Sequence, residues 1–158
     1  MGVLTDYFRA PSAAAVQEQL TLNEGGPLLT SDPSTTVYDG VEAKWIDTSV
    51  VLGKLIGFIR DEPWHPHIVD DHLIWPEGGE QDTSHEGPWV TILDNETRDT
   101  LAAVPADRVP SLAVQWSAIE ELQPNTDPQY FAELITELSA LATRAQATGD
   151  SLFCWMSL

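Results

Sequence analysis

The hydrophobic positions at the two ends of the chain alternate as they do in β-strands. In residues 2–10 the β-forming side chains divide between two faces, with Tyr7 on one face and Phe8 on the other. The closing segment 151–158, SLFCWMSL, also carries apolar side chains on both faces. A strand that is apolar on both faces normally lies inside a sheet that has other elements packed on each side. We therefore predict that the two ends of the chain form neighbouring central strands.

The clearest helical spacing lies in residues 128–148. Asp127 is a favourable N-cap, Pro128 suits the first helical position, and Gly149 suits the end of a helix. The apolar positions between them are Tyr130, Phe131, Leu134, Ile135, Leu138, Leu141, Ala142 and Ala145. Because they recur about every 3.6 residues, they predict a long amphipathic helix.

A second helix is predicted over residues 47–60, where Asp47 or Thr48 provides the cap. Its surface is apolar almost all round, which is typical of a helix at the centre of a fold. Gly53 and Gly57 are four residues apart and share one face of this helix. Their lack of side chains predicts that another element approaches the helix closely there.

Shorter patterns complete the expected fold. They predict helices over 11–22 and 94–104, a short helical piece near Pro110, strands over 67–75 and 88–94 that pair as a hairpin, and a polar loop over 23–40. The chain of 158 residues has no Pro- or Gly-rich linker, which indicates a single domain over 1–158. We expect an α+β fold: a mixed or antiparallel sheet with the terminal strands central, packed by about four helices.

The charge balance narrows the range of partners. The chain has 25 acidic and 7 basic residues, so its formal net charge is −18. A hydrophobic content of 42% with six Trp indicates a folded protein rather than a disordered acidic tail. Strong negative charge argues against direct binding of nucleic acid, whose phosphates attract basic side chains, and against anionic membrane surfaces.

Cysteine and targeting signals add little. A lone Cys154 excludes an intramolecular disulfide and a thiolate zinc site, and its apolar neighbours predict a buried small hydrophobic side chain. The opening residues lack the basic start and apolar run of a secretory signal, and no apolar stretch approaches the length of a membrane span. We expect a cytoplasmic protein.

The functional signal concentrates between Arg60 and Arg98. These 37 intervening residues contain no Lys or Arg, ten of the acids, all four His and three of the six Trp. Such a surface would attract a basic protein, because opposite charges speed association and fix orientation. The candidate binding residues are Asp61, Glu62, Trp64, Asp70, Asp71, Trp75, Glu77 and Glu80. We expect a non-catalytic acidic interaction protein, similar in principle to immunity proteins or to mimics of nucleic-acid charge.

The same segment suggests a metal site as an alternative function. His65, His67, Asp70 and His72 lie within eight residues, and imidazole with carboxylate is a common ligand set for zinc, nickel or iron. On a regular strand His72 would point away from the other two histidines unless a bulge shifts the alternation, and Pro66 makes the local path irregular and leaves this open. The competing interpretation is an exposed polar hairpin whose His and Asp side chains are only solvated.

Two further alternatives concern the aromatic and acidic residues. The tryptophans of this segment can cover the edge of the core instead of binding a partner. The negative charge can serve solvation alone, as in acid-rich proteomes, and the chain contains only two Lys.

Catalysis has little support, because no nucleophile elbow and no phosphate loop is present. The sequence predicts no cofactor.

Three segments resemble a known group of proteins. The opening MGVLTDYF, the segment AKWIDTSVVLGKLIGFI and the closing SLFCWMSL resemble uncharacterised actinobacterial proteins. They are also distantly similar to the YfbM-like family of unknown function. The resemblance covers both ends and one helix, and it implies an α+β fold without an activity. Residues 62–87 depart from the family pattern, so a function specific to this chain is expected there.

Overall fold

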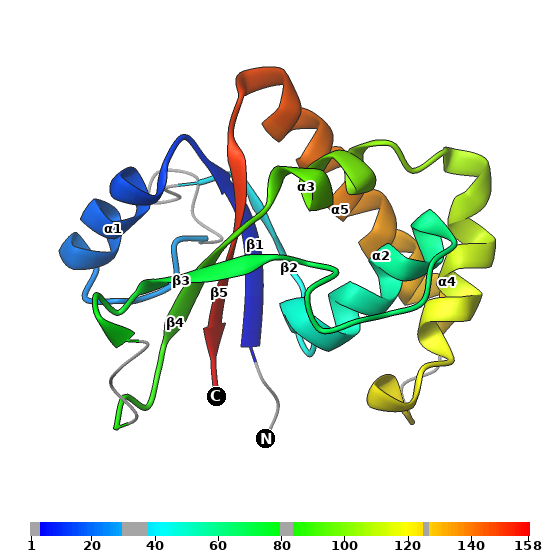
Figure 1. Ribbon diagram of the computed structural model, residues 1–158, viewed down its shortest axis with the longest axis horizontal. Coiled ribbons are helices and arrows are strands. Elements are labelled where there is room, and N and C mark those ends of the chain that lie inside the picture. The colour runs from blue at the N-terminus through cyan, green and yellow to red at the C-terminus, as the bar shows by residue number, and fades with distance from the viewer. Residues whose placement is uncertain (1–3, 30–37, 80–83, 125–126) are drawn as a thin grey trace.

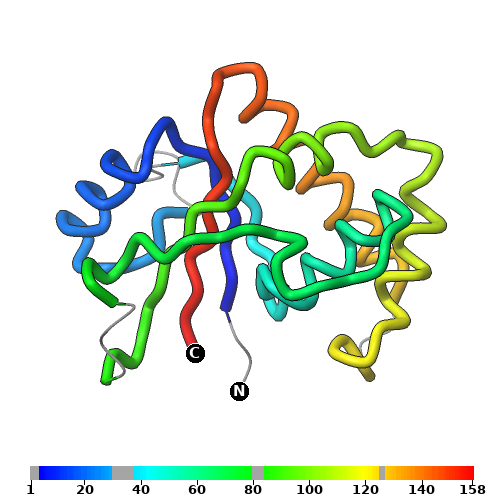
Figure 2. The backbone as a smooth tube through the Cα atoms, viewed as in Figure 1, coloured from blue at the N-terminus to red at the C-terminus, as the bar shows by residue number. Residues whose placement is uncertain are grey.

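The two terminal strands pair along their whole lengths. A computed structural model of the chain describes residues 4–29, 38–79, 84–124 and 127–158. In it, β1 (Leu4–Ala10) runs antiparallel to β5 (Ser151–Ser157), with Tyr7 opposite Cys154. Figure 2 shows that the start of β1 lies beside the end of β5.

The sheet has five antiparallel strands in the order β2-β1-β5-β4-β3. It includes β2 (Gly40–Glu42), β3 (Asp71–Trp75) and β4 (Trp89–Leu93). The fold is α+β in a single domain, and the terminal strands are neighbours inside the sheet, as predicted. The predicted loop 23–40 ends differently, because Gly40 begins a short edge strand. Gly40 has no room for a side chain, since the Tyr7 carbonyl and the Leu29 side chain lie against it.

The hairpin of β3 and β4 forms as predicted, but β3 is shorter than expected. The predicted strand 67–75 begins only at Asp71 because the chain turns just before it. The Ile68 N–H donates to the His65 carbonyl at 3.1 Å, which closes this turn. Pro66 inside the turn lacks an N–H and so favours this irregular path over a strand. The Asp94 N–H donates to the Asp70 carbonyl at 2.9 Å, and the Asp70 N–H donates to the Asp94 Oδ1 atom at 3.0 Å. These two bonds lead the chain into the hairpin.

Helices cover both faces of the sheet (Figure 1). On one face lies α1 (Ala13–Leu22), which is capped by Ser12. On the other lie α2 (Gly53–Arg60), α3 (Asn95–Ala102), α4 (Val109–Ser117) and α5 (Pro128–Thr148). These are five helices where about four were expected. The short piece predicted near Pro110 is α4, a two-turn helix with Pro110 in its first turn.

The caps and glycines that the sequence indicated perform their expected roles. Asp127 caps α5 by accepting a hydrogen bond from the Gln129 N–H at 3.1 Å. Gly149 ends α5 with φ of 73°, a left-handed conformation that glycine adopts without strain. Asp47, rather than Thr48, caps the second predicted helix through the N–H groups of Val50 and Val51. That helix starts with a π-helical turn, Thr48–Leu52, before it continues as α2.

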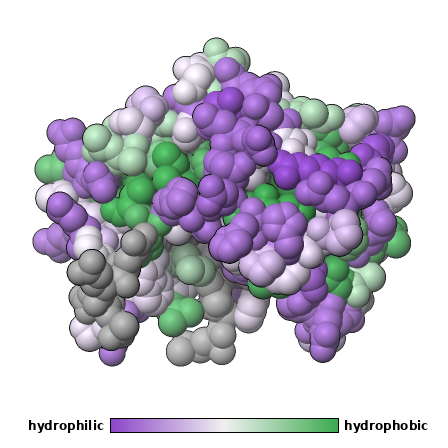
Figure 3. Space-filling view, in the orientation of Figure 1, coloured by the Kyte–Doolittle hydropathy of each residue, from purple (hydrophilic) through white to green (hydrophobic). Residues whose placement is uncertain are grey.

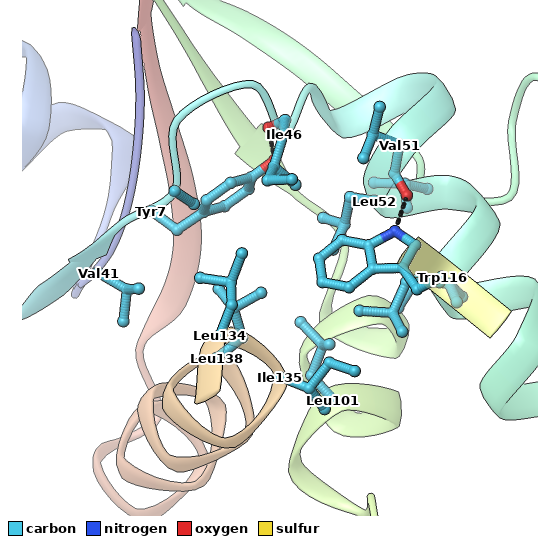
Figure 4. Packing of buried hydrophobic residues seen from close by; sticks show 14 of the residues in the cluster. Tyr7, Val41, Ile46, Val51, Leu52, Leu101, Trp116, Leu134, Ile135 and Leu138 are labelled. Atoms are coloured by element: carbon cyan, nitrogen blue, oxygen red, sulfur yellow. Dashed lines mark hydrogen bonds between the residues drawn. The ribbon is translucent and has the colours of Figure 1, made fainter. Parts of the chain in front are cut away.

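The alternating strands feed two apolar clusters, one on each side of the sheet. Phe8 and Phe153 stack at 5.4 Å in the smaller cluster beneath α1. The larger cluster lies between the sheet and the other four helices, and Figure 4 shows its centre. There the Tyr7 hydroxyl donates to the Ile46 carbonyl at 2.6 Å, and the Trp116 indole N–H donates to the Val51 carbonyl at 2.8 Å. These bonds tie the turn before α2 to β1 and α4.

Candidate functional site

The segment that connects α2 to β3 lies on the surface. Residues 61–67 are all exposed, and Figure 1 shows this segment and β3 along the front of the molecule. We define the acidic face as the four exposed carboxylates on this segment and just after β3, namely Asp61, Glu62, Asp70 and Glu77. Figure 3 shows that this side of the molecule is largely hydrophilic. Glu80, the remaining predicted acid, lies outside the described residues.

Asp61 stands where helix physics disfavours an acid. It ends α2 in a left-handed conformation, with φ of 54° and ψ of 45°, a position usually taken by glycine. A negative charge at a helix C-terminus also opposes the helix dipole. No ion pair compensates Asp61 within the described ranges, and the neighbouring Glu62 meets Arg60 only at 3.7 Å. Because glycine fits this backbone better and a negative charge is unfavourable here, we expect the acid at position 61 to lower the stability of the fold.

Trp64 is the exposed aromatic side chain beside these acids. Its exposed fraction is 38%, and its indole N–H donates to the Ser49 carbonyl at 2.9 Å. It lies over the glycine face of α2: a side chain at Gly53 would come within 2.8 Å of the Trp64 Nε1 atom, and one at Gly57 within 2.9 Å of the Glu62 carbonyl. The predicted close approach at the two glycines is confirmed. Because the two glycines lack side chains, Trp64 and the backbone at Glu62 can pack directly against α2.

Two predicted members of the binding surface contribute to the fold. Asp71 is half-buried and accepts a hydrogen bond from the Thr48 hydroxyl at 2.7 Å, which ties β3 to the start of the second helix. Trp75 is half-buried and packs against the apolar cluster beneath α1. For Trp75, covering the core edge is the observed role. Neither side chain extends the acidic face.

The histidines do not converge as the metal interpretation requires. Asp70 and His72 approach to 3.5 Å, and both are well exposed. His65 and His67 lie in the exposed turn before β3, and within the described ranges neither belongs to a group of three possible ligands. Among all residues that the structure describes, no three His, Cys, Asp or Glu side chains are placed to hold a metal ion. Pro66 bends the backbone here, so the sequence spacing does not become a spatial cluster.

Cys154 has the buried position predicted for it. Burial raises the pKa of its thiol, so the side chain stays protonated and unreactive at neutral pH. The neighbouring Tyr7 hydroxyl is fully buried too, and burial raises its pKa. Both groups belong to the core of the sheet.

Six of the seven basic side chains are engaged inside the molecule. These contacts join Arg9 to Asp39 and Asp150, Lys54 to Glu121, Arg60 to Glu62, Arg98 to Asp99, Arg144 to Asp39, and Arg108 to the carbonyls of Phe58 and Ile59. Lys44 differs, because it contacts an aromatic ring: its Nζ lies 5.3 Å from the centre of the Trp45 ring. Within the described residues Lys44 has no acidic partner. The basic residues therefore leave the acidic face without a neutralising cation except Arg60.

Sequence reasoning missed a pocket on another part of the surface. Its volume is about 760 Å³, and it lies between the turn after β2 and the start of α5. Trp45 and Tyr130 line it with exposed fractions of 45% and 44%, and Lys44 borders it. The only sequence signal for this site is Trp45 beside Lys44, one of the two lysines in the chain. This signal does not predict a pocket, because the opposite wall of the pocket comes from residues about 80 positions later in the chain.

Two acidic residues lie opposite each other on the neighbouring strands β1 and β2 of the sheet. Asp6 on β1 lies directly opposite Glu42 on β2. Burial, followed by repulsion from Glu42, raises the pKa of Asp6 to about 6. Both line a smaller hollow that Lys44 also borders. Asp6 is thus ionised at neutral pH at a cost to stability.

Comparisons with models of protein families, with curated proteins and with solved structures found no match. The resemblance to the YfbM-like family therefore stays a prediction. No helix in the described ranges combines the length and apolar character needed to cross a membrane.

Proposed function

We propose that this chain is a non-catalytic binding protein whose acidic face docks a basic protein partner. The proposal is that of an immunity-like protein or a charge mimic, in which negative side chains meet a positive surface. Long-range attraction would speed the encounter, and the matched charges would set the orientation of the complex. We also propose a cytoplasmic location for this function, and the free, buried thiol of Cys154 is compatible with it.

The observation that carries the proposal is the position of Asp61. A glycine would suit its left-handed backbone, and a neutral or basic side chain would suit the end of α2. Residues that oppose fold stability without a compensating contact are expected at functional sites. An acid at this position, followed at once by Glu62, is therefore better explained by what lies outside the molecule than by packing.

Trp64 supports the same conclusion from its geometry. Interfaces place aromatic side chains near their centres, where charged neighbours surround them. Trp64 is exposed, yet its bond to Ser49 and its contact with Gly53 fix its orientation. A side chain held in place before binding loses little conformational entropy when a partner covers it. The proposed docking surface thus combines exposed carboxylates with one oriented aromatic side chain, Trp64.

Replacing Asp61 by glycine separates binding from folding. We expect Asp61→Gly to raise the urea midpoint, because it removes the backbone strain and the charge at the helix end. The same change should weaken binding to an immobilised decalysine peptide about twofold to threefold, since one exposed charge pair contributes little. Glu18→Gln on the exposed side of α1 is the control and should leave binding nearly unchanged. Unaltered affinity in Asp61→Gly would contradict the proposal.

A further inference from the structure

The pocket beside Trp45 has the size and lining of a small-molecule site. Its volume of about 760 Å³ lies within the range of about 300–1,000 Å³ that ligand pockets occupy. Its apolar walls come from Trp45, Leu122, Tyr130 and Phe131, and its charged groups are Lys44 and Asp127. This pocket is separate from the acidic face, so its function does not depend on the proposal above.

The backbone of Trp45 adopts a conformation that is unfavourable for a residue with a bulky side chain. Trp45 has φ of 76°, in the left-handed region that a bulky side chain rarely adopts. Such strain persists where the surrounding structure enforces it, and it concentrates at ligand sites. The following residue, Ile46, is fully buried and bonded to Tyr7, which anchors the turn. The anchored turn keeps the Trp45 ring at the pocket although nearly half of it is exposed.

The opposite wall is connected to the core. Phe131 is buried and meets the Trp116 ring at 5.4 Å and the Tyr130 ring at 5.2 Å. Trp116 in turn is bonded to the Val51 carbonyl. This chain of contacts fixes the Tyr130 ring at the pocket, so both aromatic walls are formed before a ligand arrives. A preformed site of this kind binds with a smaller entropic loss.

The charges at the pocket favour an anion. Lys44 is the basic side chain that has no acidic partner in the part of the chain that the structure describes. The positive end of α5, a helix of 21 residues, lies at the same pocket. Asp127 carries the one carboxylate that lines this pocket, and its Oδ1 atom already accepts the Gln129 N–H as the helix cap. The Lys44 ammonium and the N-terminus of α5 are thus the groups at this pocket that would attract an anion.

We propose that the Trp45 pocket binds a small organic anion with a flat apolar ring, such as an aromatic carboxylate or sulfonate. The ring lies against Trp45 and Tyr130, and the anionic group pairs with Lys44 at the mouth. Aromatic stacking supplies the apolar contribution, and the charge-assisted contact selects an acid over a neutral compound of the same shape.

Two matched fluorescent probes test the proposal with the full chain. The first is 8-anilinonaphthalene-1-sulfonate, and the second is N-phenyl-1-naphthylamine, which has the same rings without the sulfonate. We expect one sulfonate probe to bind per chain. Lys44→Gln should weaken the sulfonate about fivefold and leave the neutral probe unchanged. Lys54→Gln, which alters the other lysine and its pair with Glu121, should affect neither probe.

The aromatic wall is tested by Trp45→Gly, because glycine fits the left-handed backbone. This variant should keep the urea midpoint and lose affinity for both probes by about fivefold or more. Tyr130→Ala tests the opposite wall and should weaken both probes as well. The proposal is overturned if the wild-type chain binds no sulfonate probe, if the two lysine variants weaken it equally, or if Trp45→Gly binds like the wild type.

Discussion

Removing the charge of Asp6 should stabilise the protein at neutral pH. Asp6 lies opposite Glu42 across two strands, and burial with this repulsion raises the pKa of Asp6 to about 6 from an ordinary value of 3.8. Folding therefore disfavours the ionised form. The resulting penalty is absent when both folded and unfolded chains are protonated, grows between about pH 4 and pH 6, and is complete above about pH 6. Asp6→Asn removes it.

The size of the gain follows from the pKa. The difference between the pKa of Asp6 in the folded chain and its ordinary value corresponds to about 3 kcal/mol in the free energy of unfolding if the carboxyl group is fully removed from water. Asp6 is only partly buried, and solvent screening reduces the expected gain to about 1 kcal/mol. The gain should be fully present near pH 8 and reduced by about half near pH 5, where the folded chain is protonated and the unfolded chain is not.

Urea unfolding monitored by tryptophan fluorescence measures this gain at both pH values. Glu42→Gln removes the neighbouring charge and should also stabilise the chain near pH 8, because it lowers the pKa of Asp6. Glu18→Gln, at an exposed position of α1, controls for the general benefit of removing one charge from an acidic protein. The reasoning is refuted if Asp6→Asn gains no more than Glu18→Gln near pH 8, or if its gain does not depend on pH.

Three other predictions concern the core and the close approach at α2. Tyr7→Phe should lower the free energy of unfolding by about 1–3 kcal/mol in urea titrations, because the buried Ile46 carbonyl loses its donor. Gly57→Ala should lower it by about 1 kcal/mol, since the added methyl group would lie 2.9 Å from the Glu62 carbonyl, and an unchanged or higher midpoint would contradict the contact. Cys154 should resist a thiol reagent near pH 8 until urea unfolds the chain, and rapid labelling of the folded chain would show the burial to be wrong.

The fold was predictable where its signals are local. The terminal strands alternate apolar residues on both faces, and their central positions follow directly from the burial of both faces. The long helix α5 has its cap, its first proline and its terminal glycine within the chain that forms it. The role of Gly53 and Gly57 was also predictable, because a glycine pair on one helix face leaves room for another segment.

The candidate site depends on contacts between distant segments, so its composition was less predictable. Asp71 looked like a surface acid, but its bond to Thr48, 23 positions earlier, makes it part of the framework. The histidine spacing left open whether His72 joins the other two, and the turn at Pro66 places His65 and His67 before β3, so no three ligands meet among the described residues. The Trp45 pocket forms only when the turn after β2 meets the start of α5, and no local pattern in either segment indicates the other.

The most direct test of the acidic face compares two triple variants of equal net charge. Asp61→Asn, Asp70→Asn and Glu77→Gln together neutralise three of the four carboxylates of the acidic face, while Glu18→Gln, Glu133→Gln and Glu137→Gln neutralise three exposed acids on the helices α1 and α5. Each triple changes the net charge of −18 by three, so any difference between them reports position rather than total charge.

Binding to immobilised decalysine is measured for both variants at about 20 mM and about 500 mM NaCl. The proposed function predicts that the acidic-face variant loses about tenfold in affinity at low salt, that the helix variant loses less than about threefold, and that high salt removes most binding of the wild type. If both variants lose affinity for decalysine equally, the acidic face is not a docking surface. The negative charge would then serve only to keep the protein solvated.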